Sequence, residues 1–164
     1  MKKISFNLKN SSDIFLAFKV AIVILLIKIL LTAIGELVVS IAGLPLEFFG
    51  SDRQIPEVTL DDAVFVIFMA PIIETLLGQT IPIKIGMKFT SDNKKLIVFS
   101  AIIFSLLHLP VIGFMVSAFA MGSVFSWIYI MKGGGLKAFK IVFLAHLIHN
   151  SIAFTAALTL QWLQ

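Results

Sequence analysis

The chain has 164 residues, of which 59% are hydrophobic and only 13% are charged, and its mean hydropathy is +1.06. A soluble globule of this size cannot hide so much apolar surface, and a disordered chain needs low hydrophobicity and high charge. The composition therefore predicts a multi-pass transmembrane helical bundle, an all-α fold. Because cysteine is absent, disulfides, cysteine-bound zinc and thiol catalysis are excluded.

Five segments are long and apolar enough to be candidate spans, with about 20 residues per crossing as the ruler. They cover about residues 14–44, 61–84, 96–109, 111–131 and 137–163, the third being short and ending at Pro110. The first run is too long for the apolar part of a signal peptide, so we expect it to be retained. The predicted organisation is a cytoplasmic N-terminal segment over residues 1–13 and a single transmembrane domain over residues 14–164.

Lysines gather at the N-terminus and in the second and fourth loops, whereas the first loop has Arg53 alone among five acidic residues. The positive-inside rule then places the N-terminus in the cytoplasm, and five spans place the C-terminus outside the cell membrane. The formal net charge of +4 is explained by this orientation. We expect the lipid bilayer as a partner and no nucleic acid.

Several polar residues fall where the spans should cross lipid, and such residues are functional candidates because they are costly there. At a rise of about 1.5 Å per residue, Glu74 lies about 15 Å from Lys84, and His108 about 20 Å from Lys95. By the same measure, His146 and Asn150 lie about 14 and 20 Å beyond the start of the last span. Three helices can therefore bring a carboxylate and two imidazoles together near the midplane.

Spacing supports one polar site. Residues four apart share a helix face, and the pairs with this spacing are Phe104 and His108, His146 and Asn150, and Thr75 and Gln79. His149 also belongs to the polar set, and we interpret it as a helix-contact or supporting residue.

Two further patterns concern packing and charge. Ala118, Gly122 and Ser126 form a small-residue face that should let the fourth span pack closely behind the polar cluster. Lys28 and Glu36 share a face of the first span, where they either pair or face another helix.

The motifs match a known pattern in order and placement. Glu74-Thr75-Leu-Leu-Gly-Gln79, Phe104-Ser-Leu-Leu-His108 and His146-Leu-Ile-His-Asn150 stand on successive polar spans. They resemble the CPBP family of intramembrane endopeptidases (CAAX protease and bacteriocin-processing, or Abi), whose pattern is EExxxR, FxxxH and HxxxN or HxxxD. The resemblance covers about residues 59–155. Two positions depart from it, because Thr75 replaces the second Glu and Gln79 replaces the Arg.

The resemblance implies that Glu74 and His108 activate the attacking water, and that His146 and Asn150 hold the developing oxyanion. The residue types suit this chemistry, because hydrolysis needs a base for water and donors for the oxyanion. The expected substrate is a membrane-associated or secreted peptide or protein, such as a bacteriocin precursor. We expect no cofactor; the alternative is zinc or another divalent metal held by Glu74, His108 and His146.

Other functions fit the same residues. Because Thr75 and Gln79 depart from the pattern, the chain is alternatively a catalytically degenerate relative that acts as a bacteriocin immunity or membrane scaffold protein. A polar knot that only stabilises the bundle is the structural alternative. A small proton-coupled transporter is a third possibility, because it would also use a buried carboxylate and imidazoles. Substrate, cleavage site and oligomeric state do not follow from the sequence.

Overall fold

The computed structural model describes residues 12–44 and 59–163. The first eleven residues, with the predicted N-terminal lysines, and the first loop with Arg53 lie outside the described residues. Within the described ranges all regular structure is helical, as predicted. Five helical rods result: α1 (Asp13–Ala42), a rod over residues 60–86, α5 (Asn93–Leu106), α6 (Ile112–Met131) and α7 (Gly135–Trp162).

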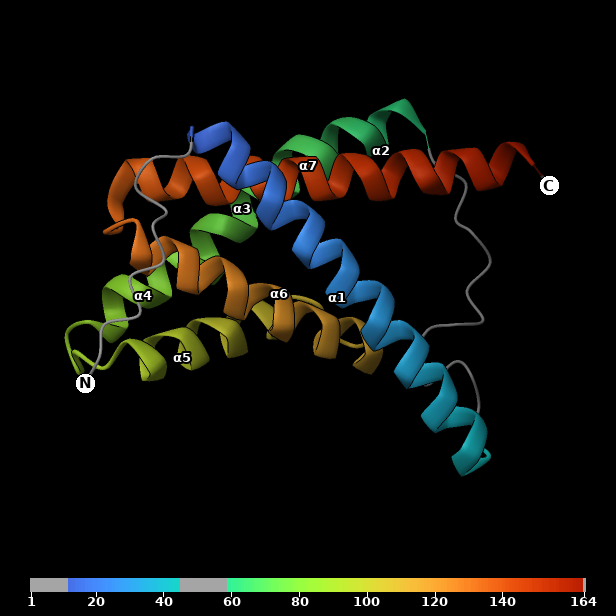
Figure 1. Ribbon diagram of the computed structural model, residues 1–164, viewed down its shortest axis with the longest axis horizontal. Coiled ribbons are helices and arrows are strands. Elements are labelled where there is room, and N and C mark those ends of the chain that lie inside the picture. Colours follow the sequence, from blue (N-terminus) through green and yellow to red (C-terminus); the bar gives the residue numbers. More distant parts are fainter. Residues whose placement is uncertain (1–11, 45–58, 164) are drawn as a thin grey trace.

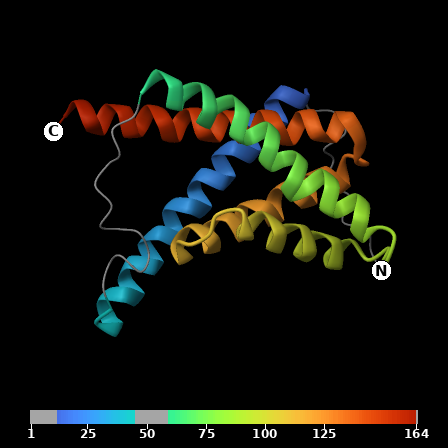
Figure 2. The ribbon, with the colours of Figure 1, turned by 180° about the vertical axis from the view of Figure 1, so that it is seen from behind.

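The rods run back and forth between two ends of the molecule (Figure 1). α5 and α6 lie side by side, α7 packs against α1, and the rod over residues 60–86 lies against both α5 and α7. The reverse view shows the same rod running obliquely across the bundle (Figure 2). Four rods are long and apolar enough to cross a membrane, namely Asp13–Ala42, Asp61–Gly86, Ile112–Met131 and Gly135–Trp162. α5, about 21 Å long, is shorter and ends before the turn at Pro110.

One end of the bundle joins the start of α1 to the connection between α6 and α7. The Asp13 carboxylate lies 3.8 Å from Lys132 Nζ and 3.5 Å from Lys137 Nζ. The turn between α4 (Ile81–Gly86) and α5 lies toward this end as well (Figure 1). The second and fourth loops, which carry the predicted cytoplasmic lysines, are therefore at the same end as the start of α1.

The rod over residues 60–86 alternates between two helix types. α2 (Leu60–Val64), α3 (Ala70–Thr75) and α4 are separated by two π-helical turns, η2 (Phe65–Met69) and η3 (Leu76–Thr80). Pro71 and Pro82 stand in the first turns of α3 and α4. Proline lacks an N–H and its ring collides with the carbonyl four residues earlier, so each helix widens just before its proline.

A chain of buried hydroxyls ties this rod to its neighbours. Pro82 cannot donate to the Gly78 carbonyl, and that carbonyl instead accepts a hydrogen bond from Ser100 Oγ of α5. Ser126 Oγ of α6 donates in turn to Ser100 Oγ at 2.7 Å. The small-residue face of Ala118, Gly122 and Ser126 is buried, so α6 packs closely as predicted.

Candidate active site

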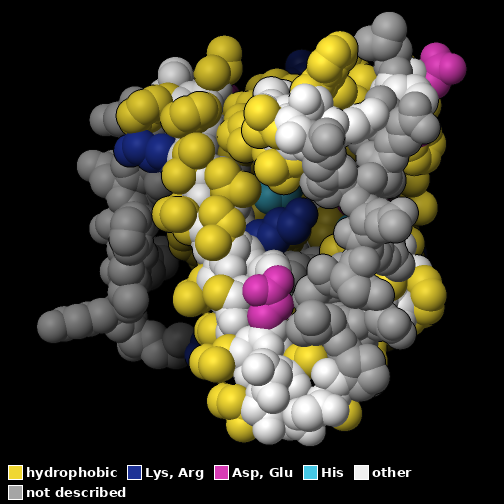
Figure 3. Space-filling model, turned by 90° about the vertical axis from the view of Figure 1, so that its right-hand side faces the viewer, with side chains coloured by type: hydrophobic (Ala, Val, Ile, Leu, Met, Phe, Trp, Pro, Cys, Tyr) yellow, Lys and Arg dark blue, Asp and Glu magenta, His cyan; other side chains and the backbone are white. Residues whose placement is uncertain are grey.

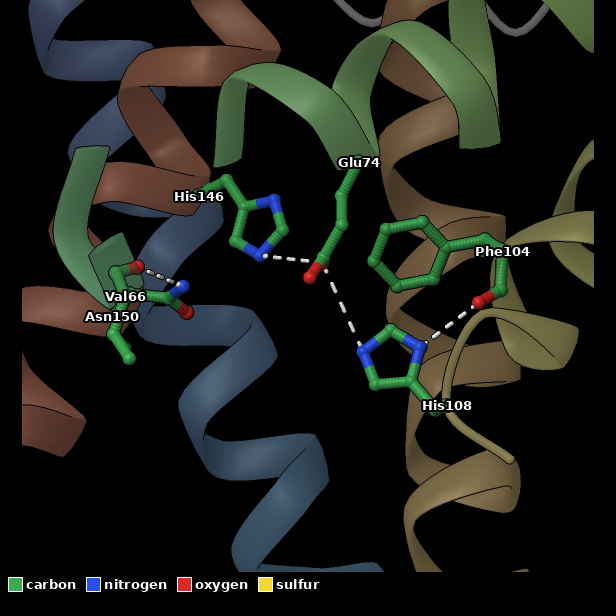
Figure 4. Close-up of polar contacts among 6 residues, drawn as sticks. All are labelled: Val66, Glu74, Phe104, His108, His146 and Asn150. Carbon is green, nitrogen blue, oxygen red and sulfur yellow. Dashed lines mark hydrogen bonds and ion pairs between the residues drawn. The ribbon is translucent and has the colours of Figure 1, made fainter. Parts of the chain in front are cut away.

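Glu74 lies between two imidazoles from two other rods (Figure 4). Its Oε2 atom is 3.8 Å from His108 Nε2, just beyond the end of α5, and 3.4 Å from His146 Nε2 of α7. Glu74 itself belongs to α3, between the two π-turns. Three of the four residues for which the sequence predicted a common depth are thus brought into one cluster.

His108 is oriented by its own helix. Its Nδ1 lies 2.9 Å from the Phe104 carbonyl oxygen, which can only accept a hydrogen bond. A neutral His108 ring therefore carries its proton on Nδ1 and presents the lone pair of Nε2 to Glu74. The 3.8 Å between Nε2 and Oε2 is longer than a direct hydrogen bond, and it suits a water that donates to both atoms.

His146 has the opposite arrangement. The ring is 2% exposed, and its Nδ1 has no hydrogen-bond partner among the described residues. Nε2 faces the Glu74 carboxylate, so a neutral ring gains most by carrying its proton there. Glu74 is therefore flanked by one imidazole that accepts a hydrogen bond and one that donates.

Asn150 is held by a carbonyl that Pro71 leaves without a helical partner. In η2 the Ala70 N–H donates to the Phe65 carbonyl, and the next nitrogen in that register, that of Pro71, has no hydrogen. The carbonyl of Val66 accepts instead from Asn150 Nδ2 at 2.9 Å (Figure 4). This contact fixes the Asn150 amide next to the histidines of α7.

Phe104 forms the packed floor of the site. Its side chain is fully buried, and its ring centroid lies 5.0 Å from that of His108 and 5.8 Å from that of His146. A Cβ added to Gly78 or Gly122 would collide with this ring or its Cβ. Both glycines are therefore needed for the ring to fit between η3 and α6.

The cluster opens onto a cavity of about 190 Å³, which has room for several waters or a peptide backbone. Residues of α6 form one wall, and the ionisable or amide groups that line the cavity are Lys28, Glu74, His108, His146, His149 and Asn150. Figure 3 shows lysine or arginine and histidine side chains gathered in a hollow among hydrophobic ones. His149, expected as a supporting residue, is 2% exposed, and its Nδ1 has no partner among the described residues.

The sequence did not assign Lys28 to the site, although its place in the middle of an apolar run was the available signal. No ion pair between Lys28 and Glu36 is present. Lys28 faces the cavity from α1, so the interpretation that it faces other helices describes its position better than pairing with Glu36 does.

Thr75 and Gln79, the two positions that depart from the family pattern, are fully buried. The Thr75 hydroxyl and both polar atoms of the Gln79 amide have no partner among the described residues. Neither residue lines the cavity. These two positions therefore belong to the packing beneath the site.

Within residues 12–44 and 59–163, no three histidine, aspartate or glutamate side chains are arranged so that they could hold a metal ion. Glu74, His108 and His146 share a single carboxylate oxygen as their common contact, with both imidazoles directed at it.

Comparison with known proteins identifies the family. The family model described as type II CAAX prenyl endopeptidase Rce1-like matches residues 57–152, more than half of the chain. The protein belongs to this family. The matched region contains Glu74, His108, His146 and Asn150, whereas α1 with Lys28 lies outside it. Neither the search of curated proteins nor the search of solved structures gave a match. The Rce1-like family is a family of membrane proteases, so the chain is assigned to the hydrolases.

Replacing Gly78 by Ala should disturb the floor of the site. The added methyl group meets the Phe104 ring, whereas the methyl group of Gly86→Ala meets the flexible end of Leu96. Both changes replace a glycine of the same rod by alanine, Gly78 within η3 and Gly86 at the end of α4, and the main difference between them is the neighbour that the methyl group meets. We expect Gly78→Ala to be about 1–3 kcal/mol less stable than Gly86→Ala in detergent unfolding experiments. Equal stability of the two variants would show that Phe104 is free to move.

Proposed function

We propose that this protein is an intramembrane endopeptidase that hydrolyses peptide bonds of membrane-associated or secreted peptides. The observation that carries the proposal is the Glu74 carboxylate between two imidazoles of opposite hydrogen-bonding character, facing a cavity large enough for water. Membership of a CAAX protease family supports the same reaction class.

In the proposed mechanism, Glu74 and His108 activate the nucleophile. A water between Glu74 Oε2 and His108 Nε2 donates one hydrogen bond to each atom. Its oxygen keeps a lone pair that can attack the carbonyl carbon of the substrate. As the carbon–oxygen bond forms, the water proton moves to the Glu74 carboxylate. Glu74 then returns this proton to the leaving nitrogen as the carbon–nitrogen bond breaks, which restores the carboxylate.

In the same proposal, His146 and Asn150 stabilise the oxyanion. His146 carries an N–H on Nε2, and the Asn150 amide has a second N–H beside the one given to Val66. Both residues line the cavity. Donors fixed in advance toward developing negative charge are usually the largest single contribution to such catalysis.

The replacement of the family's second Glu and its Arg is compatible with activity. Thr75 and Gln79 are buried and do not line the cavity, so no step of the mechanism uses them. Removing both members of a buried ion pair together leaves no unpaired charge. We further propose that the reaction needs no metal, because Glu74 and His108 can activate the water by accepting its protons or hydrogen bonds alone.

The first test compares peptides from cells that carry wild-type protein with those from cells that carry Glu74→Gln, by N-terminal proteomics. We expect a set of new N-termini that disappears with Glu74→Gln, because the amide cannot accept the water proton. Glu36→Gln, which changes an exposed carboxylate on α1, is the matched control and should leave the set unchanged. Protein abundance is matched by immunoblot, and cleavage of an identified peptide is repeated with EDTA, which should not slow it.

Identical peptide profiles for wild type and Glu74→Gln would contradict the protease proposal. An intact cellular phenotype of Glu74→Gln would then favour the immunity or scaffold alternative, which the changes at positions 75 and 79 suggest. Loss of cleavage with EDTA, restored by zinc, would contradict only the metal-free mechanism.

We also propose that the N-terminus lies in the cytoplasm and the C-terminus outside. The contact of Asp13 with Lys132 and Lys137 supports this, because it places the start of α1 beside the lysine-bearing fourth loop. The chain has no cysteine, so Ser11→Cys and Leu163→Cys each introduce a single thiol. In intact cells a membrane-impermeant maleimide should label Leu163→Cys and spare Ser11→Cys. The reverse pattern would invert the proposed orientation.

A further inference from the structure

Lys28 lies too deep in the bilayer for its charge to be explained by the membrane surface. It stands in the middle of α1, about 21 Å or more from either end of that helix along its axis. The hydrocarbon layer is about 30 Å thick, so a lysine there cannot easily extend its ammonium group into water. A charged group at this depth is costly and needs a polar partner inside the protein.

The surroundings of Lys28 contain the groups proposed for catalysis. The half-buried side chain lines the same cavity as Glu74, His108 and His146. No carboxylate within the described residues lies within 4.0 Å of its ammonium. The cation therefore faces the reaction cavity without a direct counter-ion.

Peptide hydrolysis moves negative charge across this cavity. In the resting site the charge is on the Glu74 carboxylate. When the water proton moves to Glu74, that carboxyl group becomes neutral and a full negative charge appears on the carbonyl oxygen of the substrate. A cation on the cavity wall stabilises the reaction only if it interacts more strongly with the charge in its later position.

In the resting site, each neutral donor residue already has one N–H directed at an acceptor. The Nε2 of His146 faces Glu74, and Asn150 Nδ2 donates to the Val66 carbonyl. The Lys28 ammonium has three N–H donors and no carboxylate contact. We propose that Lys28 is a further catalytic residue, whose ammonium group stabilises the oxyanion. This assignment rests on the proposed protease function, and α1 lies outside the region matched by the family model.

The test measures kcat and KM in proteoliposomes, with a peptide whose Glu74-dependent cleavage the proteomic comparison has identified. Lys28→Met keeps the length of the side chain and removes its charge, and the loss of a charge at mid-membrane favours insertion. We expect kcat to fall about 100-fold while KM changes less than about twofold. Lys28→Arg should keep activity within about tenfold of wild type. Lys19→Met, which removes an exposed lysine of the same helix, is the matched control.

A second measurement, the affinity for a stable analogue of the tetrahedral intermediate, tests the interaction with the oxyanion directly. A phosphinic pseudopeptide of the same sequence carries a tetrahedral anion at the position of the scissile bond. Lys28→Met should bind it about 100-fold more weakly than wild type, in line with the loss in kcat.

Several outcomes would overturn the assignment. An unchanged kcat would remove Lys28 from the reaction, and a raised KM with unchanged kcat would make it a binding site for a substrate anion. Equal losses in Lys28→Met and Lys28→Arg, with lower thermal stability, would show a structural role. Each of these results leaves the protease function standing, whereas cleavage by Glu74→Gln at the wild-type rate would overturn both proposals.

Discussion

A backbone carbonyl that loses its helical donor at membrane depth needs another donor inside the protein, and this constraint organises the structure. This constraint is strongest in the rod over residues 60–86, which contains two prolines. Pro71 and Pro82 each remove a donor from the helix, and side chains of other rods satisfy the exposed carbonyls. The Asn150 side chain donates a hydrogen bond to the Val66 carbonyl, and the Ser100 hydroxyl donates one to the Gly78 carbonyl. Helix breakage in one rod thereby specifies how the others dock, and it fixes Glu74 between the two attachment points.

The same docking explains why the site is compact. Phe104 fits between Gly78 and Gly122, and its ring supports both His108 and His146. The imidazoles therefore reach Glu74 from two rods without depending on one another. His108 Nδ1 contacts the Phe104 carbonyl, which leaves an acceptor on Nε2, whereas the His146 Nε2 faces Glu74 as a donor, so the carboxylate lies between one acceptor and one donor. In the proposed mechanism the acceptor holds the attacking water, and the donor faces the developing oxyanion.

Helical periodicity and depth were enough to predict the rods and to place Glu74, His108 and His146 together, since both depend only on rise per residue and span length. The π-turns were not predictable in the same way. A proline signals a disturbance, but its repair depends on which distant side chain meets the free carbonyl. Lys28 was left outside the predicted site because spacing along one helix shows only that it shares a face with Glu36, whereas the packing of the helices places it at the cavity.

The departures at positions 75 and 79 can be understood in the same physical terms. A buried acid and its basic partner are costly to desolvate, so they are lost more safely together than singly. Thr75 and Gln79 leave no charge in the packed interior, and the price is three buried polar atoms without partners in the described chain. Meanwhile the groups that face the cavity keep one carboxylate, three imidazoles and one lysine. The chemistry of the cavity is therefore separable from the packing beneath it, and a change in the packing need not end the reaction.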